Sequence, residues 1–175
     1  MKATSSDSSW LSQEKFMQIE PQKEHHWLNQ LQGKWDSETE YSMEPNQPPS
    51  KIRGTEVVRS LGGFWIVMEG DGEMPDGSAG KTIMSLGYNP QSQRYVGTFI
   101  GSMMTHLWLY NGCLDASGKV LTLETEGPNF NQSAMAKYKD IIEFISADHR
   151  IMTSQILGDD GNWLQFMTSH YQRQK

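Results

Sequence analysis

Two acidic residues fall at positions that should face the inside of a β-sheet. The basic residues of segment 51–61 share one parity, which places Glu56 on the opposite face. In segment 136–147 the charged residues again share the outward parity, and Asp140 takes the inward one. Inward carboxylates are costly unless they are paired or hydrated, and two in one site raise one pKa. This pattern suits acid–base catalysis by Glu56 and Asp140 with help from Tyr41. The simpler alternative is a structural role, in an ion pair or in bonds to Tyr and Arg side chains.

A second set of inward positions is rich in hydroxyl, aromatic and methionine side chains. In segment 35–44 the acidic residues alternate with an inward row that includes Ser37, Thr39 and Tyr41. Hydroxyls in that row have two explanations. They line a cavity, or they bond to neighbouring backbone within a core. Methionine adapts to cavities but fills ordinary cores equally well. The residues that we predict to contact a ligand are Trp35, Thr39, Tyr41, Glu56, Met68, Met84, Phe99, His106, Trp108, Tyr138, Asp140 and His170.

The histidines and the cysteine give no motif for a metal or a nucleophile. His25 and His26 are adjacent, which is not the i, i+4 spacing of a helical metal pair. Cys113 is the single cysteine, so neither an internal disulfide nor a CxxC zinc site can form. We therefore predict no metal and no cofactor. A haem iron held by His106 or His170 stays as an alternative.

Composition and charge narrow the class of protein. The chain has 175 residues, 36% hydrophobic and 21% charged, with a net charge of −6, which fits one globular domain. There is no basic run and no long apolar stretch, so we expect neither a nucleic-acid nor a membrane partner. Residues 1–10 lack the apolar region of a signal peptide, and we expect a cytoplasmic location.

The positioning elements follow from periodicity and turn residues. Residues 1–20 are polar and aperiodic and indicate a loose tail before a domain over 21–175. Segment 22–32 has helical spacing and ends before Gly33. Beyond it, turn residues separate about ten short strands, which predicts a single all-β, up-and-down antiparallel barrel with one short N-terminal helix. The expected strands are 35–44, 51–61, 64–73, 80–88, 93–101, 105–114, 119–126, 136–147, 149–157 and 162–173.

Two sets of residues resemble known families. Gly33-Lys34-Trp35 is similar to the G-x-W start of lipocalin-like (calycin) barrels, in which a late arginine packs on the tryptophan; Arg173 would take that part. A more specific resemblance, over about 24–173, is to the bacterial DUF1579 family. It implies a calycin-like barrel and supplies no catalytic residues. The residues that carry it are 53–55, 61–65, 87–90, 95–106, 118–123, 126–128 and 171–173.

Four functions remain open at this point. The leading hypothesis is that the barrel binds a small, partly apolar molecule in its cavity. The alternatives are an enzyme that uses the inward carboxylates, a haem-binding barrel, and a ligand-free interaction module. In the last case Leu107 and Leu109 would form the face of a homodimer, since both parities are apolar near 105–110.

Overall fold

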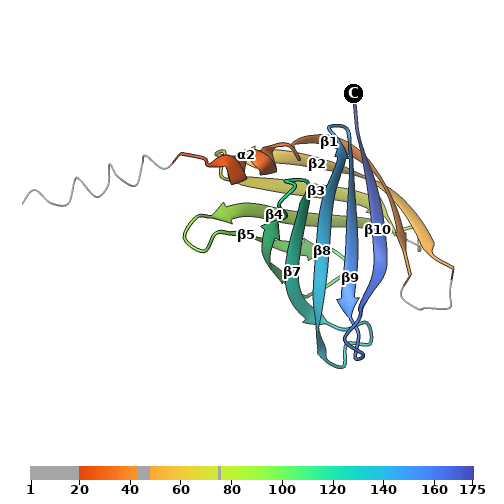
Figure 1. Cartoon of the computed structure of the whole chain (residues 1–175). Helices are drawn as coiled ribbons and strands as arrows, with labels where there is room; N and C mark the ends of the chain where they lie inside the picture. Colours follow the sequence, from red (N-terminus) through yellow and green to blue (C-terminus); the bar gives the residue numbers. More distant parts are fainter. Residues whose placement is uncertain (1–19, 43–47, 75) are drawn as a thin grey trace, which may run out of the picture.

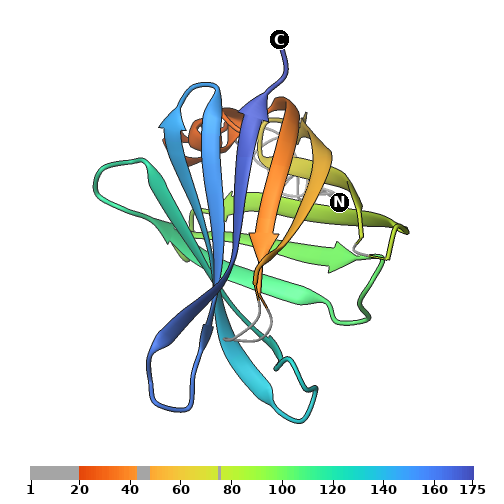
Figure 2. The same ribbon diagram turned by 90° about the vertical axis from the view of Figure 1, so that its right-hand side faces the viewer.

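Ten antiparallel strands form a closed barrel in which each strand pairs with its sequence neighbour and β1 pairs with β10 (Figures 1 and 2). The computed structural model describes residues 20–42, 48–74 and 76–175. The up-and-down barrel and the short helix before it confirm the predicted fold. The strands are β1 (Gly33–Tyr41), β2 (Ser50–Leu61), β3 (Trp65–Glu73), β4 (Ala79–Asn89), β5 (Arg94–Gly101), β6 (Trp108–Leu114), β7 (Val120–Pro128), β8 (Met135–Ser146), β9 (His149–Leu157) and β10 (Trp163–Arg173).

Alternation along the strands sets which side chains face inward. In β2, Glu56 and Val58 are buried while Lys51 and Arg59 are exposed. The period of two places successive side chains on opposite faces, so one charged row covers the outside of the barrel. The inward positions of Glu56 and Asp140 then follow from the register of their strands.

One helix, α2 (Lys23–Asn29), lies across one end of the barrel. Its buried face carries Trp27 and Leu28, and Leu31 follows in the same core. The Trp27 indole N–H donates to the carbonyl of Gly118 in the turn between β6 and β7, at 2.7 Å. Gly33 enters β1 with a φ of +126°, a conformation that favours glycine. The helix thus closes the barrel at this end.

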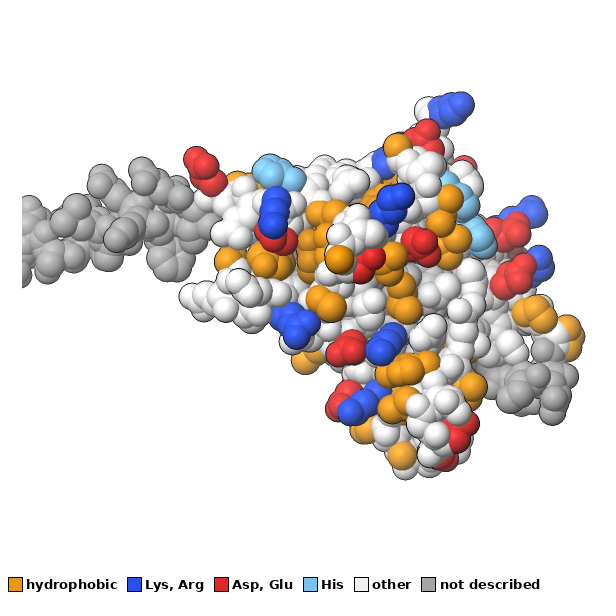
Figure 3. Space-filling view, viewed as in Figure 1, with side chains coloured by type: hydrophobic (Ala, Val, Ile, Leu, Met, Phe, Trp, Pro, Cys, Tyr) orange, Lys and Arg blue, Asp and Glu red, His pale blue; other side chains and the backbone are white. Residues whose placement is uncertain are grey.

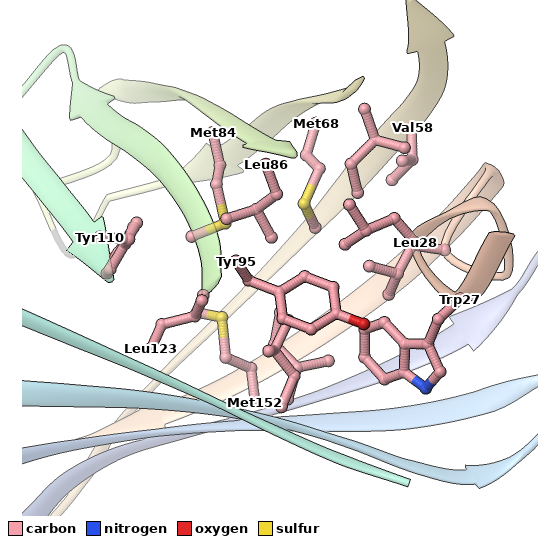
Figure 4. Packing of buried hydrophobic residues seen from close by; sticks show 14 of the residues in the cluster. Trp27, Leu28, Val58, Met68, Met84, Leu86, Tyr95, Tyr110, Leu123 and Met152 are labelled. Atoms are coloured by element: carbon pink, nitrogen blue, oxygen red, sulfur yellow. The ribbon is translucent and has the colours of Figure 1, made fainter. Parts of the chain in front are cut away.

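The hydrophobic core fills the half of the barrel next to the helix. Figure 4 shows Trp27 and Leu28 packed beside Tyr95, with Leu86 and Met68 on the neighbouring wall. Apolar burial of this kind contributes roughly 25 cal/mol per Å². The helix end is therefore a packed core, and a cavity must lie toward the other end.

Four strand ends differ from the predicted ones by two residues or more: both ends of β1, the start of β6 and the end of β7. The first strand runs from Gly33 to Tyr41 instead of over 35–44; residues 43 and 44 of the prediction lie outside the described residues, as do 1–19 of the predicted tail. β6 begins at Trp108 instead of 105, because a turn closed by the Met104 N–H and the Gly101 carbonyl delays it. β7 continues through the Gly127-Pro128 pair, which stays in register with β8.

The barrel wall is loosest between β6 and β7. The two strands pair only over 111–114 and 121–124, so the first half of β6 separates from the second half of β7 (Figure 2).

In the described ranges no helix is long and apolar enough to span a membrane.

Candidate functional site

A cavity of about 270 Å³ lies inside the barrel at the end away from the helix. Its mouth is formed at the turns after β3 and β5, where Met74, Met103 and Met104 lie. Deeper in, β1, β2, β9 and β10 supply its walls. This volume is close to the lower end of ligand pockets, roughly 300 Å³.

Thioethers and aromatic rings contribute much of the apolar lining. Met152 and Met167 line the inner part and Phe99 contributes its ring from β5. Room for the mouth methionines comes from Gly80 and Gly101: a Cβ on Gly80 would lie 2.8 Å from Met74 Sδ, and one on Gly101 2.6 Å from Met103 Sδ. Methionine is flexible and polarisable, so such a lining can adapt to the shape of an occupant.

Glu56 contributes the buried carboxylate of the cavity. Its Oε2 accepts a hydrogen bond from Nη2 of Arg150, and the two form an ion pair across the barrel. Burial raises the pKa of Glu56, and the charge and hydrogen bond of Arg150 oppose that rise. Oε1 accepts no hydrogen bond from the described residues. Both of its lone pairs are therefore open to a ligand.

Arg150 is fully buried behind Glu56 and packs on aromatic rings. Its Cζ lies 3.8 Å from the ring centroid of Tyr171 and 4.8 Å from that of Trp35. Nε and Nη1 donate to no acceptor in the described residues. Arg173 also stacks on Trp35, at 4.1 Å, as the lipocalin-like resemblance implied. Cation–π contacts and one carboxylate therefore hold the Arg150 charge in place.

Two hydroxyls that bond to each other belong to the polar part of the lining. Thr39 Oγ1 and Ser169 Oγ lie 2.7 Å apart and are hydrogen bonded across the β1–β10 pair. Both line the cavity, as does Tyr171. These hydroxyls offer a ligand weak polar contacts and carry no charge.

Asp140 lies in a separate hydrogen-bonded group. The hydroxyls of Tyr110 and Ser154 donate to its two oxygens. Burial raises the pKa of Asp140, and the two hydrogen bonds oppose that rise. Burial and then the charge of Asp140 raise the pKa of Tyr110. Asp140 does not line the cavity and does not hydrogen bond to Glu56 in the described part of the chain, so the two carboxylates have different partners.

A larger groove, of about 630 Å³, lies where β6 separates from β7. His106 bridges this gap: its Nε2 lies 3.1 Å from the Glu126 carbonyl oxygen. The Trp108 ring packs edge-on against both His106 and Tyr138, and its N–H donates to Met104 Sδ. Leu107 and Leu109 are exposed along this groove. The helix does not cover these two leucines, because α2 packs on β3 and β4.

The remaining histidine pair lies on the outer wall. His149 Nε2 and His170 Nδ1 are 3.2 Å apart, with the rings stacked. His170 is exposed on β10. Among the described residues no group of three or more His, Cys, Asp or Glu side chains could hold a metal ion.

The structure distributes the predicted ligand contacts over several places. Thr39, Tyr41, Glu56 and Phe99 line the cavity. Trp35, Met68 and Met84 lie in the packed core. His106 and Tyr138 lie at the β6–β7 groove, with Trp108 beside them. Asp140 faces the barrel interior away from the cavity, and His170 lies on the outer wall of the barrel. As ligand contacts all of them stay predictions.

Two groups of residues at or behind the cavity wall were absent from that set. Tyr171 lines the cavity floor beside Glu56, and Arg150 lies behind both without lining it. The five methionines supply the apolar wall and mouth. The density of methionine in the sequence was the available signal, and we interpreted it as an ordinary core in preference to a cavity.

The family profile described as "Protein of unknown function (DUF1579)" matches residues 20–173, nearly the whole described chain. The chain belongs to the DUF1579 family. The family's description assigns no activity, and no curated protein matches this chain. Membership therefore confirms the resemblance in the sequence without adding a functional residue.

Solved structures of similar fold support the barrel. Rv2717c from M. tuberculosis is 12% identical, with a TM-score of 0.61 over 89% of this chain and all of that one. A de novo designed fluorescence-activating β-barrel is 14% identical, with a TM-score of 0.47 over 83% of this chain and 95% of that one. At these identities the likeness concerns the fold alone, and the Rv2717c match carries it.

Proposed function

We propose that this DUF1579 protein binds a small, partly apolar molecule inside the open end of its barrel. The observation that carries the proposal is the cavity of about 270 Å³, with a methionine lining and one buried carboxylate. A few placed polar groups in an otherwise apolar pocket are typical of small-molecule sites. At about 30 Å³ per water, the volume holds roughly nine waters, so the ligand has on the order of ten non-hydrogen atoms.

The charge of the surface supports a small molecule as the ligand in preference to a polyanion. Figure 3 shows charged side chains of both signs interspersed with apolar ones over the face of β7–β10. The net charge is −6. A nucleic-acid ligand would require a basic stripe, which this face does not carry.

Native mass spectrometry on protein purified from its natural host tests the proposal. We expect one extra small mass per chain, and a visible absorption scan of the same sample reports any haem. Ser37→Phe adds bulk inside the cavity and should remove the extra mass. Glu38→Phe is the matched control, because its side chain lies on the outer face of the same strand. A ligand retained equally by both variants would overturn the proposal.

A further inference from the structure

The barrel interior contains more acidic than basic groups. Glu56 and Asp140 both point inward, and Arg150 is the one buried guanidinium in the described chain. Asp140 is held by two hydroxyls, which donate hydrogen bonds but bring no charge. With both carboxylates ionised the interior carries one uncompensated negative charge. Buried charges are stable only when they are paired, so this arrangement favours a positively charged occupant.

The cavity also presents an acceptor where that charge would sit. Oε1 of Glu56 has no partner in the described residues, while Oε2 is committed to Arg150. Arg150 itself does not line the cavity, because it is covered by Glu56 and Tyr171. An occupant therefore meets a carboxylate and not the guanidinium, and an anionic head group would have no cation to pair with at this depth.

The rim has the same sign. Asp71 and Glu73 line the mouth together with Arg53, so the lining has three carboxylates, counting Glu56, against one guanidinium. The rim carboxylates are exposed, and Asp71 is paired with Lys81, so their effect is on the approach of a charged ligand and not on its final contacts.

The apolar wall defines the rest of the occupant. Met152 and Met167 face the inner cavity and Phe99 closes one side. Thioether sulfur makes favourable contacts with aromatic rings. An aromatic ring of a ligand would also pack on the ring of Phe99. A small aromatic body fits this wall and the volume.

Building on the proposed function, we propose that the ligand class is a small primary amine with an aromatic body, its ammonium donating to Glu56 Oε1. The ammonium balances the charge of the Glu56, Asp140 and Arg150 group, and the ring lies among the methionines.

A matched ligand series tests this inference. The probes are 2-phenylethylamine, 2-phenylethanol and phenylacetate, titrated into protein with 13C-labelled methionine methyl groups. We expect the Met152 and Met167 signals to shift saturably, with the amine at least about tenfold tighter than the alcohol and the acid weakest. The exposed Met135 on β8 should not respond. Alcohol or acid binding as tightly as the amine would overturn the amine assignment alone. Absence of any shift would overturn the proposed function as well.

Two variants assign the preference to the interior charge. Asp140→Asn removes one interior negative charge without touching the lining, and should reduce the amine-to-alcohol ratio several-fold. Glu143→Gln makes the same change on the exposed face of β8 and should leave the ratio unchanged. The double variant Glu56→Met/Arg150→Met should abolish the preference while the alcohol still binds. An unchanged ratio in both interior variants would contradict the inference, and two separate interior variants guard against one that fails to fold.

Discussion

Arg150 on β9 donates to Glu56 on β2 across the barrel, between residues 94 positions apart in the chain. The pair lies at the boundary between the packed core and the cavity, since Glu56 lines the cavity and Arg150 lies over the core residue Trp35. It fixes the depth at which the apolar core ends. The polar floor of the cavity is therefore a structural ion pair with one acceptor left over.

Removing one member of this pair should cost more than removing both. Arg150→Met leaves the Glu56 carboxylate buried without its partner, and we expect a loss of about 3–5 kcal/mol in the free energy of unfolding. Glu56→Met/Arg150→Met should return to within about 1 kcal/mol of the wild type, because no buried charge is then unpaired. Urea unfolding measures all three proteins. A loss in the double variant as large as in Arg150→Met would contradict this account, because it would mean that the unpaired carboxylate costs nothing.

The raised pKa of Asp140 gives a pH dependence of known sign. Burial raises the pKa of Asp140 in the folded protein above the ordinary aspartate value of 3.8, so the folded protein binds this proton more tightly than the unfolded chain does. The stability linked to this proton is fully present below 3.8 and is lost as the pH rises through the raised value. Asp140→Asn removes this titration.

Urea unfolding of wild type and Asp140→Asn between about pH 7 and about pH 4 measures the effect. The free energy of unfolding of the wild type should rise relative to that of the variant as the pH falls. Glu143→Gln, on the outer face of the same strand, should run parallel to the wild type. A difference that shrinks on acidification would mean that the Asp140 carboxylate is stabilised in its charged form.

Gly97 should tolerate no side chain. A Cβ at this position would overlap the backbone carbonyl of Ser85 on the paired strand β4, which has no freedom to move away. We expect Gly97→Ala to cost about 1–3 kcal/mol in urea unfolding. Gly72→Ala is the control, because its Cβ would meet the Arg53 carbonyl oxygen at 3.6 Å and the Gly54 Cα at 4.0 Å, which are ordinary van der Waals distances. It should be neutral or stabilise by up to about 1 kcal/mol; a large loss there would contradict the steric argument.

Arg173 should hold the helix end to the barrel. Its guanidinium donates to the carbonyls of Gln30, Gln32 and Ala147 and stacks on Trp35. Arg173→Ala should lower the free energy of unfolding by about 2 kcal/mol, and Arg173→Lys should not restore it, because a single ammonium does not span these acceptors.

Arg94→Ala, at an exposed position of β5, is the control and should change the stability by no more than about 0.5 kcal/mol. Rescue by lysine would mean that the charge alone matters.

The sequence predicted those features that depend on strict alternation. Glu56 and Asp140 were expected to face inward because basic residues occupy the other parity of their strands, and the structure places both inside. Arg150 escaped this reasoning, since a charged residue directly after a turn is expected to face water. Only its distant partner and two rings make burial tolerable, and none of them is near it in the chain.

The periodicity of the sequence could not predict the methionines at the cavity mouth, for a different reason. Met103 and Met104 lie in the segment between β5 and β6, where no strand period assigns a direction to a side chain. Their direction depends on Gly80 and Gly101, whose missing side chains leave the space that the thioethers occupy. Which glycines face which methionines is set by the register of neighbouring strands, and that register appears only in the folded barrel.

Pairing of β1 with β10 also has a consequence for synthesis of the protein. Arg173 and its acceptor Gln32 are 141 positions apart, and the first strand has no partner on that side until the last one is made. A ribosome adds about 5–20 residues per second, so β1 waits roughly 7–30 s after it is synthesised. During that interval one edge of β1 stays unpaired even after β2 has paired with its other edge, and this is the period in which a chaperone would protect the nascent chain from aggregation.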